Sequence, residues 1–486
     1  MRRGSITIFL ALVLGSMTAL VCAGMISVQM ACARTQIQNG VDVGLFSLFG
    51  EYDKDLLEWY ELFLLNAGSG GGETDLAGVY GEFRKYMDPV LEQNGQELHV
   101  EQGGFTGYRL ATDLEGEIVY RQAVSYMREL DAREWSREGI LEENSDVARL
   151  VEKGEELEEG DWFPRYEEAL ALAREESLRR SQEENDQILT DGTTAVETVP
   201  LEFRDPLKPC IELKKRELKE LLFPEGIGKS PAASGELLSS RGRREGMAIL
   251  DDLVPDDSEE SRKLFLAYLL EKFSCYPKEA ETFPALQLEY ILVGGASDED
   301  NATETARRIF LLMEGINLGA VLSDSGLRSQ VEGFAAWICE SYLVQPDRET
   351  VEQAVRYAWV FGESLLKTRL LLAGESAATG KNAGAFLLSL EDLPLLPERL
   401  SGLGTSWSSG GEGVRYKELL YVFLDQMEKG ELLTRAMDVM EQVKRKAEPS
   451  FCLDSCITDV EIHVKVRANL KKTFEVRRIY GYTRES

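Results

Sequence analysis

The chain has 486 residues, of which 54 are basic and 85 are acidic, so its formal net charge at pH 7 is −31. An acidic surface of this size repels the phosphates of nucleic acids and of anionic lipid headgroups, which excludes nucleic acid as a partner. A hydrophobic content of 43% is typical of a folded protein, and a chain this long is expected to hold more than one hydrophobic core.

The first 33 residues predict a transmembrane helix. A basic leader, residues 1–4, precedes an apolar run from Ser5 to Ala33 that contains no charged residue. At ~1.5 Å per residue this run exceeds the roughly 30 Å hydrocarbon core of a bilayer. Because the basic residues lie on the N-terminal side, the positive-inside rule keeps Met1 in the cytoplasm. The predicted location is therefore the cell membrane, with a single pass and the bulk of the chain extracytoplasmic.

Two other fates of this segment stay open. A cut between Gly4 and Ser5 is typical of prepilin-type peptidases, although Phe9 stands where mature pilins usually carry glutamate. A cut after Ala33 would release a secreted protein, but the apolar run is about twice as long as the apolar region of a secretory signal. We therefore favour a retained anchor, which a cut at Gly4 would leave in the membrane.

Residues 34–126 are predicted to form an extended helix and a small α/β base. Apolar residues recur every three or four positions from Val41 to Tyr60, which is helical spacing, so the anchor helix is expected to continue into the folded part. Residues 97–112 are expected to form short strands. A further helix is expected from Ile118 onward.

Helices dominate the middle of the chain. Residues 127–205 are rich in glutamate and arginine and predict exposed helix or linker, and residues 206–450 predict a helical domain. In residues 451–486 apolar and polar side chains alternate from Val460 to Ala468, which indicates a strand followed by a turn and a return strand. This C-terminal β-hairpin is expected to complete the base.

The predicted fold class is α+β and predominantly α. It combines the long N-terminal helix with a small antiparallel sheet, whose strands lie near residues 97–112 and 457–482. A large helical insertion separates these strands in the sequence. The sheet is expected to pack against the upper part of the N-terminal helix.

No motif predicts catalysis, a cofactor or a metal ion. Residues 374–382 match neither a phosphate-binding loop nor a nucleophile elbow in spacing. The two histidines, His99 and His463, lack a partner at metal-ligand spacing, although they could meet across the sheet. Cys452 and Cys456 could form a disulfide or stay as thiols. We predict that the chain is not an enzyme and holds no cofactor.

A basic cluster in the C-terminal hairpin contrasts with the acidic background. It consists of Lys465, Arg467, Lys471, Lys472, Arg477 and Arg478. One interpretation is that these charges lie on the solvent face of an edge hairpin and discourage pairing with other strands. The other is that they form a docking face for an acidic partner, which a neighbouring copy could supply.

Short motifs in order along the chain resemble an uncharacterised bacterial family, domain-of-unknown-function family 5702. They include Gly4–Leu12, Glu51–Asp53, Glu289–Leu292, Ala358-Trp359 and Arg435–Asp438. The opening also resembles that of the minor pseudopilins of tight-adherence (Tad/Flp) pili. The resemblance implies membrane attachment and association with Tad/Flp-type pilus or related secretion machinery in Gram-positive bacteria. It brings no catalytic residues.

The first functional hypothesis is a membrane-anchored, extracytoplasmic, pseudopilin-like structural or assembly protein. Its partners would be the lipid bilayer, through residues 5–33, and other pilus or secretion membrane proteins or copies of itself. The alternatives are an extracytoplasmic enzyme acting on cell-envelope polymers, and an anchored binding or sensor module. An apolar stripe left exposed between Val41 and Tyr60 would favour assembly, and a deep cleft with shifted pKa values would favour an enzyme.

Overall fold

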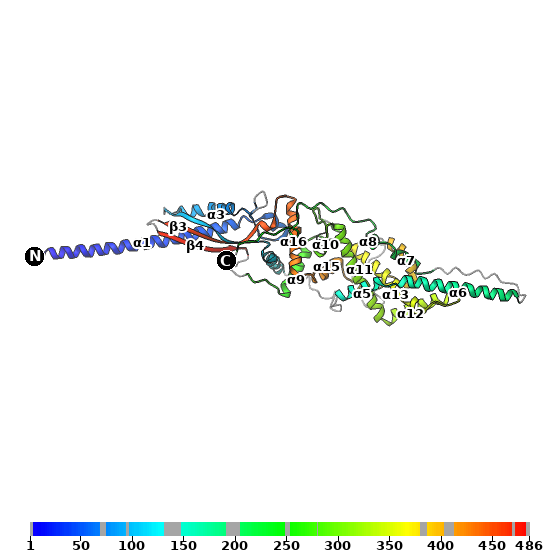
Figure 1. Cartoon of the computed structure of the whole chain (residues 1–486). Coiled ribbons are helices and arrows are strands. Elements are labelled where there is room, and N and C mark those ends of the chain that lie inside the picture. Colours follow the sequence, from blue (N-terminus) through cyan, green and yellow to red (C-terminus); the bar gives the residue numbers. More distant parts are fainter. Residues whose placement is uncertain are drawn as a thin grey trace. The chain divides into compact units, whose positions relative to one another are not determined.

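The chain forms two compact units (Figure 1). Unit 1 combines Met1–Ala132, Ala233–Lys272 and Glu428–Ser486, and unit 2 combines Arg133–Ala232 and Phe273–Met427. The structure is a computed structural model, and it describes residues 3–68, 74–93, 97–130, 147–190, 205–247, 253–278, 280–379, 386–402, 413–468 and 472–482.

Unit 1 consists of a small sheet with helices. Its helices are α1 (Arg3–Phe49), α2 (Lys54–Tyr60), α3 (Leu76–Leu91), α4 (Glu117–Glu129), α9 (Glu259–Lys272) and α16 (Lys429–Arg445), with 3-10 turns η2 (Asp113–Gly116) and η6 (Leu453–Ser455). Its strands are β1 (Leu65–Asn66), β2 (His99–Leu110), β3 (Cys456–Ala468) and β4 (Lys472–Gly481).

Helix α1 has two halves with opposite environments. Residues 6–29 are exposed along their whole length, and an 18-residue window of this part has a mean hydropathy of 2.4 with none of it buried. From Ala33 onward one face is buried, with Ile37 and Val41 at 0% exposure. This second half packs on α3 and the sheet, and Figure 1 shows the first half extending beyond them. One helix therefore carries an apolar exposed segment and a core segment of unit 1.

The prediction that α1 continues to Tyr60 is wrong. The helix ends at Phe49, and α2 begins after Asp53, whose carboxylate accepts hydrogen bonds from two backbone amides of the first turn of α2. This N-cap makes a separate helix start favourable. The apolar stripe that begins at Val41 lies within unit 1, where Val41 and Tyr60 are at most 3% exposed.

Glycine lets α3 approach α1 closely. A Cβ atom at Gly44 would lie 2.7 Å from Cε2 of Phe83, a contact that real Cβ atoms do not make. Phe83 and Met87 of α3 are fully buried between α1 and the sheet. Because Gly44 has no side chain, Phe83 and Met87 have room to pack against α1.

The sheet is antiparallel, and β3 is its central strand. It pairs with β2 on one side and with β4 and β1 on the other. The even-numbered side chains from Val460 to Val466 are buried in the core shared with α1 and α3, whereas His463, Lys465 and Arg467 point to the opposite, more exposed face. This alternation confirms the predicted strand. The predicted short strands near 97–112 form one strand, β2, with three irregularities in its register.

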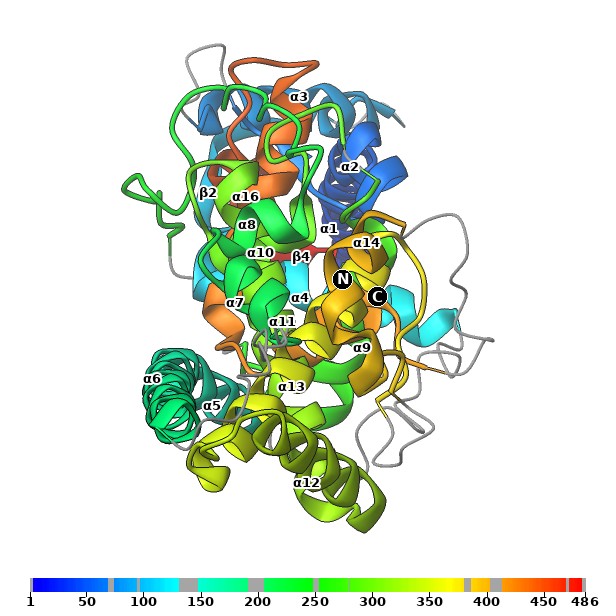
Figure 2. The same cartoon turned by 90° about the vertical axis from the view of Figure 1, so that its right-hand side faces the viewer.

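Unit 2 is helical in the described part of the chain. Its helices are α5 (Val147–Glu159), α6 (Trp162–Thr190), α7 (Lys208–Lys214), α8 (Leu218–Leu222), α10 (Gln287–Val293), α11 (Asp298–Ser323), α12 (Ser325–Glu340), α13 (Arg348–Leu372), α14 (Leu396–Ser401) and α15 (Tyr416–Leu424), with the 3-10 turn η5 (Leu390–Leu395). Helices α11, α12 and α13 pack on one another (Figure 2).

A polar network is buried between α11 and α13. Lys367 Nζ lies 3.2 Å from Glu363 Oε1 and donates to Asn317 Oδ1 at 2.8 Å, and both ionisable side chains are fully buried. The Glu363 carboxylate also accepts hydrogen bonds from two backbone amides, those of Leu387 and Leu388. Burial lowers the pKa of Lys367, and the nearby Glu363 opposes this shift. Every charged group here has partners, so the network fixes one arrangement of the core.

The carboxyl group of Glu289, on α10, is buried next to α15. Glu289 Oε1 accepts hydrogen bonds from the backbone N–H of Tyr276 and from the hydroxyl of Tyr416, both at 2.8 Å, whereas Oε2 has no partner among the described residues. Burial raises the pKa of Glu289 to about 7. The folded state therefore favours the neutral acid.

The predicted fold class is confirmed. The described residues are predominantly helical, with one long apolar N-terminal helix and a small antiparallel sheet built from β2 and the C-terminal hairpin. The predicted division of the chain into segments 1–4, 5–33, 34–126, 127–205, 206–450 and 451–486 stays a prediction.

Candidate functional site

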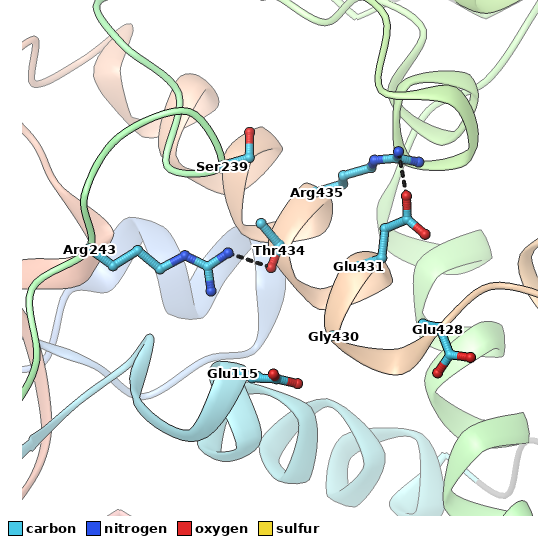
Figure 3. A pocket seen from close by; sticks show the side chains of 8 residues that line it. All are labelled: Glu115, Ser239, Arg243, Glu428, Gly430, Glu431, Thr434 and Arg435. Atoms are coloured by element: carbon cyan, nitrogen blue, oxygen red, sulfur yellow. Dashed lines mark hydrogen bonds and ion pairs between the residues drawn. The ribbon is translucent and has the colours of Figure 1, made fainter.

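A polar pocket of about 490 Å³ lies in unit 1. Three segments far apart in the sequence form it: the turn η2, the first turns of α16, and residues 234–247, which we call the strap. The strap contains no helix or named strand. The pocket is lined by Glu115, Ser239, Arg243, Glu428, Gly430, Glu431, Thr434 and Arg435 (Figure 3). None of these side chains is apolar, which suits a small polar ligand rather than a hydrophobic one.

The turn η2 presents Glu115 to the pocket from an unfavourable backbone conformation. Leu114 and Glu115 have φ values of 51° and 59°, and Gly116 follows with φ 87°. For residues other than glycine this left-handed region costs on the order of 1–2 kcal/mol. Met437 of α16 lies against the turn, since a Cβ atom at Gly116 would be 2.9 Å from its Cε.

Asp113 anchors the same turn. Its carboxylate accepts a hydrogen bond from the backbone N–H of Leu110 at 2.8 Å and another from Gly246 of the strap at 3.1 Å. Burial raises the pKa of Asp113, and the two hydrogen bonds oppose this shift. The carboxylate thus ties the strap and the end of β2 to the turn that carries Glu115.

Helix α16 begins in the pocket without a side-chain cap. Glu428 occupies the N-cap position, and its side chain makes no capping hydrogen bond. A Cβ atom at Gly430 would lie 2.6 Å from Oε2 of Glu115, so the missing side chain leaves room for this carboxylate. A negative charge at a helix N-terminus is favourable, because unsatisfied backbone N–H groups leave partial positive charge there.

The two arginines of the pocket differ in their partners. Arg435 forms an ion pair with Glu431 at 2.5 Å. Arg243 is exposed and donates a hydrogen bond to the hydroxyl of Thr434 at 2.7 Å, and no carboxylate lies within ion-pair distance of it in the part of the chain that the structure describes. In a chain with a net charge of −31, a pocket arginine without an acidic partner is notable.

A buried charge network fastens the strap to α16. The Arg241 guanidinium makes two hydrogen bonds to Glu441, at 2.6 and 2.7 Å, and one to Asp454 at 2.9 Å. The hydrogen bonds to Glu441 raise the pKa of Arg241. Arg445 also pairs with Glu441 and donates to the carbonyl of Ser234. Both carboxylates are buried, so the strap has a defined position over the helix.

A second pocket of about 1110 Å³ lies along α4 in unit 1. Its lining mixes charged side chains such as Arg121 with aromatic rings such as Tyr126 and Phe63. The side-chain amide of Gln122 hydrogen-bonds to both the backbone N–H and the carbonyl of Phe63, a residue that is 39% exposed.

The predicted basic docking face is divided between two sides of the sheet. By their register with β3, Arg477 shares the more exposed face with Lys465 and Arg467, whereas Lys472 and Arg478 lie on the side of α1. Lys471 lies outside the described residues. The predicted residues therefore do not form one continuous surface within the described hairpin.

The described cations of this hairpin also have partners within the chain. Lys465 pairs with Glu475 at 2.8 Å, and Arg478 pairs with Asp42 of α1 at 2.8 Å. The other contacts are Arg467 with Glu101 at 3.1 Å, Arg477 with Glu461 at 3.9 Å, and Lys472 with the ring of Phe474 at 6.0 Å. A docking role for these side chains stays a prediction, and an acidic partner would have to compete with the carboxylates already present.

The other residues singled out in the sequence do not come together in one site within the described part of the chain. His99 is opposite Arg467 and His463 is opposite Gly104, so the histidines do not meet across the sheet. Cys452 and Cys456 are both thiols. Gly4 and Ser5 lie in the first turns of α1. Among the described residues no group of three or more His, Cys, Asp or Glu side chains could hold a metal ion.

The polar pocket was not found from the sequence. Its residues come from positions 115, 239–243 and 428–435, and no local motif connects them. The sequence carried only indirect signals, such as a glycine close to the start of a helix. The pairing of these segments is visible only in the folded chain.

The segment that contains the strap, α16 and the central strand β3 matches a known sequence family. Residues 197–468, more than half of the chain, match the model of a family of unknown function, DUF5702. The chain belongs to this family, and the match contains every pocket residue except Glu115. No curated protein and no solved structure matches the chain.

Proposed function

We propose that this chain is a membrane-anchored, extracytoplasmic structural or assembly protein of pseudopilin type. It works with Tad/Flp-type pilus or secretion machinery and is not an enzyme. The observation that carries the proposal is the division of α1 into an exposed apolar half and a core half. Residues 6–29 span ~36 Å as a helix, enough to cross the roughly 30 Å hydrocarbon core.

The same helix connects the membrane to the folded domain without a flexible linker. Its apolar face from Ala33 to Phe49 belongs to the core of unit 1, so unit 1 is held directly above the bilayer. The basic residues Arg2 and Arg3 keep the N-terminus in the cytoplasm by the positive-inside rule. This plan, together with the resemblance of the opening to minor pseudopilins, supports a role in an assembly.

The mature N-terminus tests the proposal. Protein recovered from native membranes is analysed by mass spectrometry of its N-terminal peptide. A start at Ser5 supports processing by a prepilin-type peptidase and hence the pilus assignment. An intact Met1 removes that assignment and leaves an anchored protein. A start at Arg34 contradicts the membrane anchor.

The native cysteines of α1 test assembly within the membrane. Cys22 and Cys32 are exposed on α1. If α1 packs against other helices, mild oxidation of intact membranes should produce covalent adducts that disappear in the Cys22→Ala/Cys32→Ala variant. A chain that stays monomeric under these conditions contradicts assembly through α1. Protease treatment of intact cells gives the orientation, because an extracytoplasmic domain must be accessible.

An anchored binding module is the second candidate function. The polar pocket of unit 1 favours it, since charged groups that lack partners in an acidic protein are available for a ligand. This function needs the anchor but not assembly. An intact Met1 together with a monomeric α1 would support it.

A further inference from the structure

We propose that the polar pocket of unit 1 binds a small zwitterionic ligand, one that presents both a carboxylate and an ammonium group. The carboxylate binds at Arg243, and the ammonium group binds between Glu115 and Glu428. This inference goes beyond the proposed function, because it requires neither the anchor nor assembly.

The pocket separates charges of opposite sign. Figure 3 shows Arg243 and Thr434 at one end and Glu428 at the other, with Glu115 and Gly430 between them. Within the described ranges, the side-chain carboxylates of Glu115 and Glu428 have no hydrogen-bond or ion-pair partner. Among the residues that the structure describes, the Arg243 guanidinium donates a hydrogen bond to the hydroxyl of Thr434 and to no other group. One unpaired cation and two unpaired carboxylates therefore face one cavity without neutralising each other.

The other charged groups nearby are already paired. Glu431 binds Arg435 in the pocket. Lys429, which follows the N-cap of α16, is turned away toward Glu117 at 2.7 Å and Asp256 O at 2.9 Å. Since these neighbours have partners, the charged groups left for a ligand are Arg243 at one end, Glu428 at the other and Glu115 between them.

The size and polarity of the cavity define the ligand class. A volume of about 490 Å³ is within the usual range for small-molecule sites, and the side chains that line it belong to polar or charged residues. A ligand with a single negative charge would be attracted by Arg243 and repelled by the two glutamates. A ligand with a single positive charge would be attracted by the glutamates and repelled by Arg243. A ligand that carries both charges gains at both ends. A guanidinium also suits a planar carboxylate, because it offers two parallel donors.

The segments that carry Glu115 and Arg243 are both held in place by interactions outside the pocket. Glu115 lies in the left-handed turn anchored by Asp113, and the strap that carries Arg243 is fastened by Arg241 to two buried carboxylates. Both ends are thus attached to ordered segments before a ligand arrives. Such preorganisation reduces the entropic cost of binding.

Trialanine with free ends is the probe that tests the proposal. Its affinity for the full chain in lipid nanodiscs is measured by titration calorimetry, beside the N-acetylated, C-amidated and doubly capped forms. The free tripeptide should bind, and each cap should weaken binding about fivefold, as expected for loss of one exposed charge pair. Equal affinity of all four forms, or no binding of the free form at millimolar concentration, would overturn the proposal.

Variants assign the two ends of the ligand. Arg243→Gln should weaken the free tripeptide about fivefold but leave the C-amidated form unchanged, since that form no longer uses the arginine. Glu115→Gln should weaken binding of the free tripeptide but leave binding of the N-acetylated form unchanged, since that form carries no ammonium group. Arg328→Gln, on exposed α12 of unit 2, is the matched control and should change nothing. A loss that is the same for every probe form would contradict the assignment.

A steric variant tests the cavity without removing a charge. Gly430→Ala adds a methyl group whose carbon lies 2.6 Å from the present position of Glu115 Oε2, so this carboxylate has to move. The helix itself should not suffer, because alanine favours a helix more than glycine does. The variant should fold and should bind the free tripeptide more weakly. Unchanged affinity in Gly430→Ala would overturn the placement of the ammonium group.

A doubly capped peptide with a glutamate and a lysine side chain tests the source of the two charges. If this peptide binds, the charges can come from side chains as well as from chain ends.

Discussion

Two groups of charged side chains, one in each unit of this chain, have different environments. In unit 2 Glu363 and Lys367 are fully buried, and each has hydrogen-bond partners in addition to the ion pair. In the pocket of unit 1, Glu115, Glu428 and Arg243 are exposed and lack partners of opposite charge among the described residues. A charge can be buried only if it is paired, so the first set stabilises one core arrangement, and the second stays available to a ligand.

The largest effect is expected when the buried pair of unit 2 is broken. Lys367→Met removes the cation and leaves Glu363 buried without it, which costs about 3–5 kcal/mol. Denaturant unfolding followed by tryptophan fluorescence, with Trp359 on the same helix as reporter, measures the change. Lys263→Met is the matched control, because Lys263 is exposed in an i,i+4 pair with Glu259 and should matter by less than about 0.5 kcal/mol. Equal effects of the two variants would contradict the comparison.

The second effect is a pH dependence that originates at Glu289. Burial raises its pKa from 4.5 to about 7, so the neutral acid is favoured in the folded state. Its contribution to the free energy of unfolding is fully present below pH 4.5 and is lost as the pH rises through 7. For a fully buried group this corresponds to about 3 kcal/mol.

The Glu289→Gln variant isolates this contribution. Glutamine keeps the oxygen that accepts hydrogen bonds from Tyr276 and Tyr416, and it does not titrate. The difference in unfolding free energy between variant and wild type should grow in favour of the variant from pH 4.5 to 7.5. A difference that is independent of pH over this range would show that Glu289 is ionised in the folded state.

A smaller effect is expected at the strained end of the pocket. Glu115→Gly and Glu115→Gln both remove the carboxylate, but only glycine adopts φ near 59° without steric cost. The glycine variant should therefore be more stable than the glutamine variant by about 1 kcal/mol. Thermal unfolding of the two variants in parallel measures this difference. The opposite order would mean that the left-handed turn is not maintained in solution.

The smallest effect on stability is expected at Arg243. Its side chain is exposed and makes a single hydrogen bond to Thr434, so Arg243→Gln should change the unfolding free energy by less than about 0.5 kcal/mol. Arg241→Gln on the same strap is the contrasting variant. It removes three hydrogen bonds to the buried carboxylates of Glu441 and Asp454, which keep Arg445 and Arg244 as partners, and should destabilise unit 1 by about 1–3 kcal/mol. Similar losses in the two variants would remove the distinction between structural and available charges.

Local patterns in the sequence predicted the elements of the fold. The uncharged run after Gly4 predicted α1, and strict alternation from Val460 to Ala468 predicted β3 together with its buried and exposed faces. These signals are strong because burial of one face imposes a period on the sequence itself. The boundary after Phe49 was missed because the apolar spacing continues across the N-cap formed by Asp53.

Which partners the charged residues of the hairpin have was decided by the tertiary structure alone. The sequence shows a basic cluster in the hairpin, but its partners Glu101 and Asp42 come from β2 and α1, hundreds of residues away. The hairpin register then assigns Lys465 and Arg478 to opposite faces. Pairing between distant segments cannot be inferred from local composition, because a charge carries no information about which distant residue it will meet.

The sequence by itself thus determined the apolar segment of α1, the helical middle of the chain and the C-terminal hairpin. Each of these depends on interactions between residues a few positions apart. Only the folded chain decided that Glu115, Arg243 and Glu428 line one pocket and that Lys367 is buried beside Glu363. Glu363 and Lys367 are separated by one helical turn, yet whether that turn faces solvent or core depends on how α13 packs. Packing decides burial, and burial decides whether a charge must be paired.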